Sequence, residues 1–266
     1  MNLSRLAAVV GKEFLEMRRN RLLLWTIGLP PLALTLLPPA ILLAVRYLPA
    51  QEVSPEEISG FAKLVPQLTS FSTDELMELF LLRTFLTIFL LLPLVLPLTI
   101  AAHSIIGEKQ LRTLEPLLST PITTAELLLG KSLAAVAPAV VATWLAYAVF
   151  FSTMPWFVST PRVYRALLEP TWLLAAVALS PLLSLLSVSC GVAISARVND
   201  PRSTQSVSVL LILPVISVVA GQAVGWFLLD LRLLCVGSAL VALVDAAILY
   251  AGVLLFDRET ILTRWK

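Results

Sequence analysis

Charged residues are scarce in this chain, and the residues that build metal sites are almost missing. Asp, Glu, Lys and Arg make up 14% of the 266 residues, whereas an ordinary soluble domain has about 25%. The single histidine, His103, excludes a multi-histidine metal cluster. Both cysteines, Cys190 and Cys235, lie in apolar runs, where we expect packing residues rather than a disulfide or a metal site. The small net charge of +2 gives no reason to expect binding to nucleic acid.

A nucleotide-binding loop is also missing. The tripeptide Gly130-Lys131-Ser132 resembles the end of a Walker A motif, but that motif needs a glycine five residues before Gly130, and Ala125 stands there. No Gly-x-Ser-x-Gly motif or intramembrane Ser–His pair is present, which disfavours a hydrolase. We therefore predict no catalytic site and no cofactor in this chain.

Apolar residues, by contrast, are abundant and are concentrated in six long runs. Hydrophobic residues make up 58% of the chain, and the mean hydropathy is +0.92. A membrane-spanning helix needs about 20 predominantly apolar residues, and open strands would leave backbone groups unpaired in hydrocarbon. We therefore predict an all-α membrane protein that forms a single transmembrane domain over residues 1–266. The predicted spans are 22–45, 84–104, 132–158, 171–196, 206–229 and 233–256.

The distribution of basic residues predicts the orientation in the membrane. Of the 19 lysines and arginines, 13 lie on one side of the predicted spans and 6 on the other, and cytoplasmic loops carry the excess. Both termini should therefore be cytoplasmic, and we expect the protein in the plasma (inner) membrane. Residues 46–83 then form an acidic external loop, in which Ser54 and Ser72 each begin a capping-box pattern that predicts a helix. The second of these helices should continue into the second span.

The first 21 residues have the pattern of an amphipathic helix. Apolar residues recur at helical spacing, whereas charged residues occupy the other faces. The run that follows is too long for a signal-peptide core and has no small-residue cleavage site. We therefore predict an interfacial helix over residues 1–21 that lies along the cytoplasmic surface and contacts membrane lipids. Its apolar face contains Leu3, Leu6, Val10, Phe14 and Met17, and its other faces carry Arg5, Lys12, Glu13, Glu16 and Arg19.

The most distinctive connection is the cytoplasmic segment 105–131, between the second and third spans. Glycine and proline punctuate it, and Thr123 and Glu126 have capping-box spacing for the start of the next helix. A short charged helix with an apolar side, held between two spans, indicates contact with a partner in the cytoplasm. That apolar side contains Leu111, Leu114, Leu117 and Leu118.

Short motifs in three parts of the chain form a recognisable set. Segment 105–131 contains Glu108-Lys109, Thr113-Leu114-Glu115, Leu117-Leu118, Thr120-Pro121 and Gly130-Lys131. Residues 196–205 with 211–214, and residues 256–262, supply weaker motifs. Together they resemble the permease subunits of type-2 ABC exporters. The chain departs from that family at Arg112, where a glycine is common, and at Gln110, where an acidic residue is common.

The resemblance implies that segment 105–131 forms coupling helices that dock on an ATPase subunit. It also implies a second permease half, identical or related, and two ATPase subunits that bind ATP and Mg²⁺. ATP binding would then close the ATPase dimer, push on the coupling helices and open the pathway toward the outside. The cargo stays open, because relatives carry lipids, peptides, drugs and ions. The implied coupling residues are Gly107, Glu108, Lys109, Arg112, Thr113, Leu114, Glu115, Leu118, Thr120, Pro121, Arg197, Asp200 and Arg202.

Asp245 is the one charged residue within the sixth predicted span, and it supports an alternative function. An acid at the centre of a membrane helix costs about 2.5 to 3.5 kcal/mol and usually faces a bundle interior or a cavity. We expect it to point away from lipid, and either to hydrogen-bond to a neighbouring helix or to line the cargo path. A channel or secondary transporter with a midplane site around Asp245 is the alternative, which the lack of an internal repeat disfavours.

Near the outer end of the fifth span, Gly221 and Gly225 allow either close helix packing or a re-entrant turn.

Overall fold

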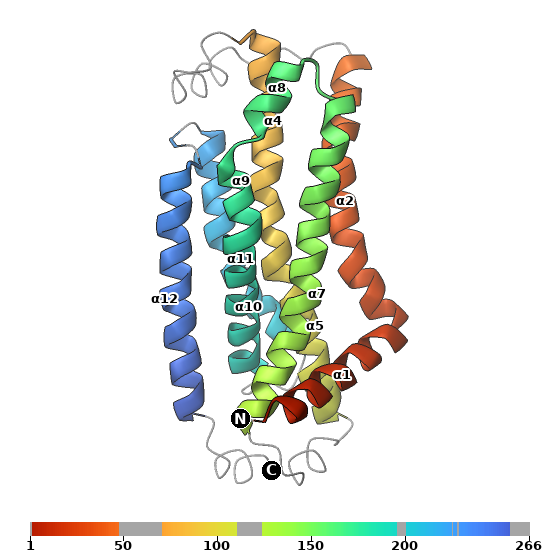
Figure 1. The fold of residues 1–266 in the computed structure, drawn as a ribbon, viewed down its shortest axis with the longest axis vertical. Coiled ribbons are helices and arrows are strands. Elements are labelled where there is room, and N and C mark those ends of the chain that lie inside the picture. The colour runs from red at the N-terminus through yellow and green to blue at the C-terminus, as the bar shows by residue number, and fades with distance from the viewer. Residues whose placement is uncertain are drawn as a thin grey trace.

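The helices of the chain pack side by side into an elongated bundle in the computed structural model (Figure 1). The structure describes residues 2–47, 71–110, 124–195, 201–224, 226–227 and 229–255. In these ranges every regular element is helical, which confirms the predicted all-α membrane fold. The α-helices are α1 (Leu3–Arg19), α2 (Arg21–Tyr47), α4 (Thr73–Ile88), α5 (Leu92–Gln110), α7 (Thr124–Thr153), α8 (Pro161–Leu167), α9 (Pro170–Leu174), α10 (Ser180–Ser195), α11 (Pro201–Ala223) and α12 (Leu231–Leu255).

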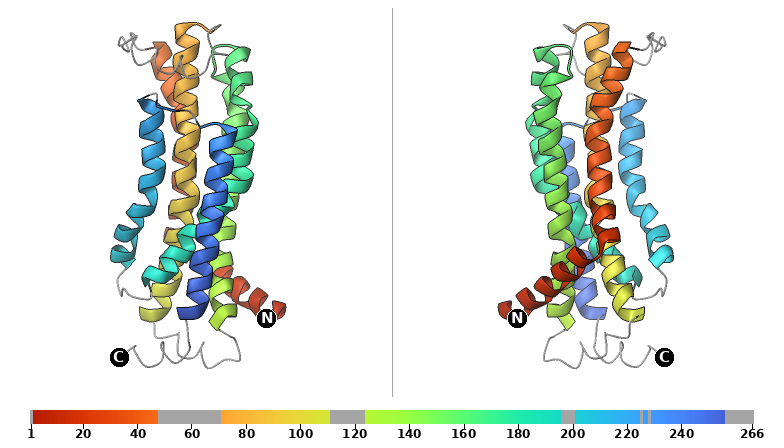
Figure 2. Two further views of the ribbon diagram at one scale, coloured as in Figure 1. Left: turned by 90° about the vertical axis from the view of Figure 1, so that its left-hand side faces the viewer. Right: turned by 90° about the vertical axis from the view of Figure 1, so that its right-hand side faces the viewer.

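Five helical stretches are long and apolar enough to cross a membrane. A further helix, α11, contributes a shorter apolar stretch, Leu210–Gln222. Successive passages, in which α4 continues into α5 and α9 into α10, run in opposite directions along the bundle (Figures 1 and 2). The protein is therefore an integral, multi-pass membrane protein, and the count of six spans remains a prediction. The five long stretches are Arg21–Val45, Thr73–Ala101, Leu129–Trp156, Pro170–Gly191 and Leu231–Ile248.

The membrane helices extend beyond the apolar runs that predict them. α4 begins at Thr73, within the predicted external loop, because Ser72 forms a capping box. The Ser72 hydroxyl accepts a hydrogen bond from the Glu75 backbone N–H at 3.3 Å, and the Ser72 N–H donates to the Glu75 carboxylate at 3.0 Å. The helix start predicted at Ser72 is thus confirmed, whereas the one at Ser54 lies outside the described residues. α5 and α7 likewise extend into the predicted coupling segment.

Two of the membrane passages change their winding just before a proline. Phe89–Leu91 form a 3-10 turn between α4 and α5, two residues before Pro93. Ala175–Leu179 form a π-helical turn, two residues before Pro181. Proline has no backbone N–H, and its ring meets the carbonyl four residues earlier, so the α-helical hydrogen bond is lost there. These prolines alter the helix locally without ending the passage.

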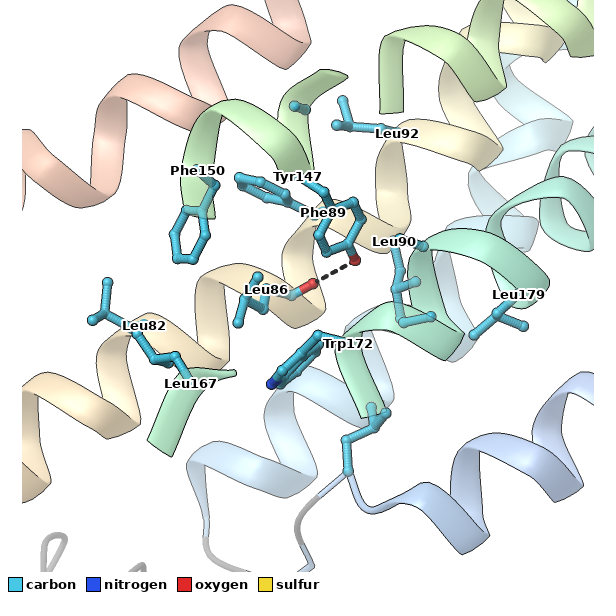
Figure 3. Close-up of a cluster of buried hydrophobic side chains, with 14 of the residues drawn as sticks. Leu82, Leu86, Phe89, Leu90, Leu92, Tyr147, Phe150, Leu167, Trp172 and Leu179 are labelled. Carbon is cyan, nitrogen blue, oxygen red and sulfur yellow. Dashed lines mark hydrogen bonds between the residues drawn. The ribbon is translucent and has the colours of Figure 1, made fainter. Parts of the chain in front are cut away.

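The main apolar core lies where α4, α7, α8 and α9 meet, in the half of the bundle remote from α1 (Figures 1 and 3). The Phe89 ring packs edge to face against Tyr147 and Phe150, with ring centroids 5.3 and 5.4 Å apart. Such pairs add about 0.5 to 1.5 kcal/mol beyond the burial of apolar area. The Tyr147 hydroxyl donates a hydrogen bond to the Leu86 carbonyl at 3.1 Å (Figure 3). Aromatic packing thus joins the 3-10 turn after α4 to α7, and the hydrogen bond joins α4 itself to α7.

Polar contacts fasten the same end of the bundle near its surface. Arg83 of α4 pairs with the Glu169 carboxylate and donates to the Ala166 carbonyl at 3.3 Å. Glu78, also on α4, accepts a hydrogen bond from the Ser159 backbone N–H at 3.0 Å. These contacts hold the connection between α7 and α9 against α4.

Candidate functional site

The predicted coupling residues belong to two connections that leave the bundle at the same end. α5 ends and α7 begins there, α10 ends and α11 begins there, and α1 crosses the same end obliquely (Figures 1 and 2). Gly107, Glu108 and Lys109 lie in the last turn of α5, and Arg202 lies in the first turn of α11. The capping residue Thr123 lies outside the described residues, as do Arg112, Thr113, Leu114, Glu115, Leu118, Thr120, Pro121, Arg197 and Asp200.

A buried ion pair joins α1 to α7 at this end. Lys131 Nζ lies 2.8 Å from Glu13 Oε1, and the two side chains are only 5% and 7% exposed. Ser104 of α5 completes the cluster, because its hydroxyl donates to Glu13 Oε2 at 2.7 Å and accepts from Lys131 Nζ at 2.8 Å. Three polar side chains therefore connect α1 to two helices, α5 and α7, that lie far from it in the sequence. We name Glu13, Ser104 and Lys131 the α1 anchor.

The surroundings of Glu13 keep its carboxylate ionised at neutral pH. Burial by itself raises the pKa of Glu13, but the nearby Lys131 ammonium, hydrogen bonds from Lys131 and Ser104, and the charge of Lys12 outweigh it. The net result is a pKa below the ordinary value of 4.5. Removing one partner from a buried, hydrogen-bonded ion pair is costly. We therefore expect α1 and the first turns of α7 to move together.

Close backbone packing supports the α1 anchor. A Cβ atom added to Gly130 of α7 would lie only 2.7 Å from Val9 Cγ1 of α1, so any larger residue would push the helices apart. Just before α1, the Asn2 backbone N–H donates to the buried Glu126 carboxylate at 2.7 Å. Near the other end of α1, Met17 packs in a second buried cluster with residues of α2, α5, α7 and α10. α1 is therefore held along its length.

The buried face of α1 differs from the predicted apolar face. Leu3, which the pattern placed on that face, is 72% exposed. The buried residues are Val9, Glu13 and Met17, so Met17 is the one member of the predicted apolar face that is buried. Glu13, which the pattern placed on another face, is buried as well. Residues four apart share a helix face, and the spacing of these three could have indicated the buried side. The lone Lys131 at the start of the third span was the other available signal.

Asp245 lies inside the bundle, on α12 where that helix packs against α10. The residue is 2% exposed, and neither carboxylate oxygen has a hydrogen-bond partner among the described residues. The predicted hydrogen bond to a neighbouring helix is thus not seen in this part of the chain. Leu240 and Leu243 of the same helix are exposed, so Asp245 sits away from that apolar outer face. Its place on a cargo path remains a prediction.

Gly221 packs against the turn that follows its own helix. A Cβ atom at Gly221 would lie 2.6 Å from Phe227 Cε1, and the Trp226 N–H donates to the Gly221 carbonyl at 2.9 Å. α11 ends at Ala223. The described residues thus give this glycine a role in a turn, whereas Gly225 lies outside them.

The sequence model of a protein family, described as ABC-2 family transporter protein, matches residues 7–247 of this chain. The matched range covers most of the sequence and includes all three residues of the α1 anchor. The chain belongs to the ABC-2 transporter family. It is therefore the permease subunit of an ABC transporter, and permeases of this family associate with ABC ATPases. Membership of this ABC-2 family favours the permease function over a channel or a secondary transporter. No curated protein matches the sequence.

Proposed function

We propose that this ABC-2 permease is one membrane half of an ATP-driven exporter, and that a separate ATPase subunit docks at the end of the bundle that carries α1. The proposal rests on one observation above all: α1 and the flanks of both predicted coupling connections converge at that end (Figures 1 and 2). The excess of basic residues on the same side supports a cytoplasmic position. A second permease half, identical or related, and a second ATPase subunit would complete the transporter.

In this proposal, α7 is the helix that carries motion along the bundle. It follows the coupling segment, bears Lys131 in its early turns, and contributes Tyr147 and Phe150 to the aromatic core. The α1 anchor ties its first turns to α1 and α5, so a push on residues 111–123 displaces three helix ends together. Packed cores respond as units rather than deforming continuously. The displacement therefore reaches α4 through the core and opens the pathway at the far end.

The ATPase subunit would supply all of the nucleotide chemistry. ATP and Mg²⁺ would bind there, and closure of the two ATPase subunits would generate the push. This chain contributes contacts and helix movements. Its coupling residues Glu108, Arg112 and Glu115 offer charges of both signs to a complementary surface, which favours one docking register over others.

Co-purification tests the proposal. When the tagged permease is extracted from its native membrane, an ABC ATPase should come with it. Glu108→Arg and Glu115→Arg should reduce the bound ATPase or its stimulated activity, because a like charge at a partly buried contact is costly. Glu56→Lys, in the predicted external loop, is the matched control and should change neither quantity. If both coupling variants bind and stimulate ATPase as the parent does, docking does not occur at this segment. If no ATPase is recovered, the exporter assignment fails.

The orientation is tested separately by labelling single introduced cysteines from outside the cell. Cysteine at Lys63 should react with an impermeant reagent, and cysteine at Arg112 should react after the membrane is permeabilised. The opposite pattern would place the α1 end outside the cell and remove the basis for ATPase docking there.

A further inference from the structure

The outward face of the first half of α2 carries an open groove of about 420 Å³. This volume lies in the range of small-molecule sites, about 300 to 1,000 Å³. Gly28 leaves a gap in the helix surface, since a Cβ atom there would meet nothing within 4 Å. Trp25 beside it is 69% exposed. The groove is lined by Arg21, Leu24, Trp25, Gly28, Leu29 and Leu32, which recur along one side of the helix.

Arg21 lines the end of this groove that is nearest to α1, and two further arginines precede it in the chain. Arg18 and Arg19 end α1, Arg21 begins α2, and all three are exposed. Among the described residues, their guanidinium groups form no ion pair or hydrogen bond. The nearby acids are engaged elsewhere, because Glu13 belongs to the α1 anchor and Glu16 pairs with Lys12 at 3.3 Å. The bend between α1 and α2 therefore carries positive charge that an external anion can balance.

We propose that this groove and the three arginines together bind an anionic phospholipid, with its phosphate at Arg21 and an acyl chain along Gly28 toward Leu32. Guanidinium groups bind phosphate oxygens through paired, charge-assisted hydrogen bonds. Tryptophan favours the level of the lipid headgroups, and Trp25 lies one helical turn from Arg21. The helix rises about 16 Å from Arg21 to Leu32, which is about half of the hydrocarbon thickness and so matches one leaflet.

A second copy of the chain fits this surface less well. In a symmetric dimer the same patch of both copies meets, so Arg18, Arg19 and Arg21 of one copy would face the same three arginines of the other. Like charges at an interface are costly, and the two acids of α1, Glu13 and Glu16, are already paired. A phospholipid supplies both an anionic head and an apolar chain, in the same order along the helix as the arginines and the groove.

Fluorescence of Trp25 provides the measurement. The full-length permease is reconstituted in phosphatidylcholine bilayers that contain increasing fractions of brominated phosphatidylglycerol or brominated phosphatidylcholine. The fluorescence of Trp25 is the difference between the fluorescence of the parent and that of Trp25→Phe, and its quenching is followed as the fraction of brominated lipid rises. We expect half-maximal quenching at a lower mole fraction of the anionic lipid than of the neutral one. Arg21→Gln should reduce this preference about five-fold, the equivalent of about 1 kcal/mol for one arginine. Gly28→Leu fills the groove and should abolish the preference.

Two variants on α12 are matched controls. Arg232 is an exposed arginine in the first turn of a membrane helix, and Gly237 is a helical glycine with nothing within 4 Å of an added Cβ atom. Arg232→Gln and Gly237→Leu should therefore leave the preference unchanged. Each variant is compared with the parent by gel filtration, and Arg21→Gln carries the test if Gly28→Leu does not fold.

The other outcomes overturn the proposal in distinguishable ways. Equal quenching by the two lipids, or a preference that survives both Arg21→Gln and Gly28→Leu, would show that no selective lipid site exists here. Absence of quenching by either lipid would show that protein, such as a second permease half, covers the face. Displacement of the anionic lipid by soluble glycerol phosphate would show a phosphate site that does not need the groove.

Discussion

Replacing Lys131 with methionine should release α1 from the bundle. The substitution keeps a long, unbranched side chain but removes the ammonium group that lies 2.8 Å from Glu13. The Glu13 carboxylate then stays buried with the Ser104 hydroxyl at 2.7 Å and with Lys12 Nζ at 3.7 Å. Breaking a buried ion pair from one side costs about 3 to 5 kcal/mol. The equilibrium between docked and released α1 should therefore shift toward release by about two orders of magnitude or more.

Hydrogen exchange of the α1 backbone amides measures this release, because exchange reports local opening. Lys131→Met should accelerate exchange in α1 by at least about 100-fold and leave the amides of the aromatic core unchanged. Lys12→Met is the matched control, since Lys12 also approaches Glu13 but its side chain is 37% exposed. An exposed pair contributes at most about 1 kcal/mol, so this control should change exchange by less than about five-fold.

A double variant separates the ion pair from the packing around it. Glu13→Leu combined with Lys131→Met removes both charges, and apolar replacement of a whole buried pair is often neutral or stabilising. The double variant should therefore regain most of the protection that Lys131→Met loses. If α1 in Lys131→Met exchanges as slowly as in the parent, the ion pair does not hold α1 and the reasoning is refuted.

Three further predictions concern acid, packing and the buried acid of α12. The folded-state pKa of Glu13 lies below 4.5. The Glu13 carboxylate therefore stabilises α1 docking fully above pH 4.5, and this stabilisation is lost as the pH falls through the folded-state pKa. Exchange of the α1 amides should accelerate over that pH range in the parent, and Glu13→Gln should remove the pH dependence. Gly130→Ala places a methyl group 2.7 Å from Val9 and should weaken docking by about 1 to 3 kcal/mol, whereas Gly11→Ala, with open space around it, should not; the same exchange measurement compares them. Asp245→Leu removes a buried carboxyl that has no described partner and should raise the thermal midpoint in detergent; a lower midpoint would show that the carboxyl is stabilised.

The membrane helices could be predicted because the requirement for crossing a bilayer acts on composition alone. A run of about 20 predominantly apolar residues satisfies it whatever its neighbours are, and the five long apolar stretches of the described residues are 18 to 29 residues long. The start of α4 could also be predicted, because the capping box of Ser72 and Glu75 uses residues only three apart. The short motifs of segment 105–131 indicated the family for a similar reason, since each motif is local. The turns at Phe89–Leu91 and Ala175–Leu179 required the structure.

The sequence by itself therefore determined that this chain crosses the membrane as helices and belongs with ABC permeases, but not which of its charges are buried. Glu13 is one of several charged residues on a short amphipathic helix, and its partner Lys131 is 118 positions away. The pair forms only because α1 lies across α7 at Gly130, where the missing side chain allows close approach. Burial of either charge alone would be costly, and the cost falls only when both leave water together with their hydrogen-bond partners. That condition depends on the positions of three helices at once, so only the tertiary structure could decide it.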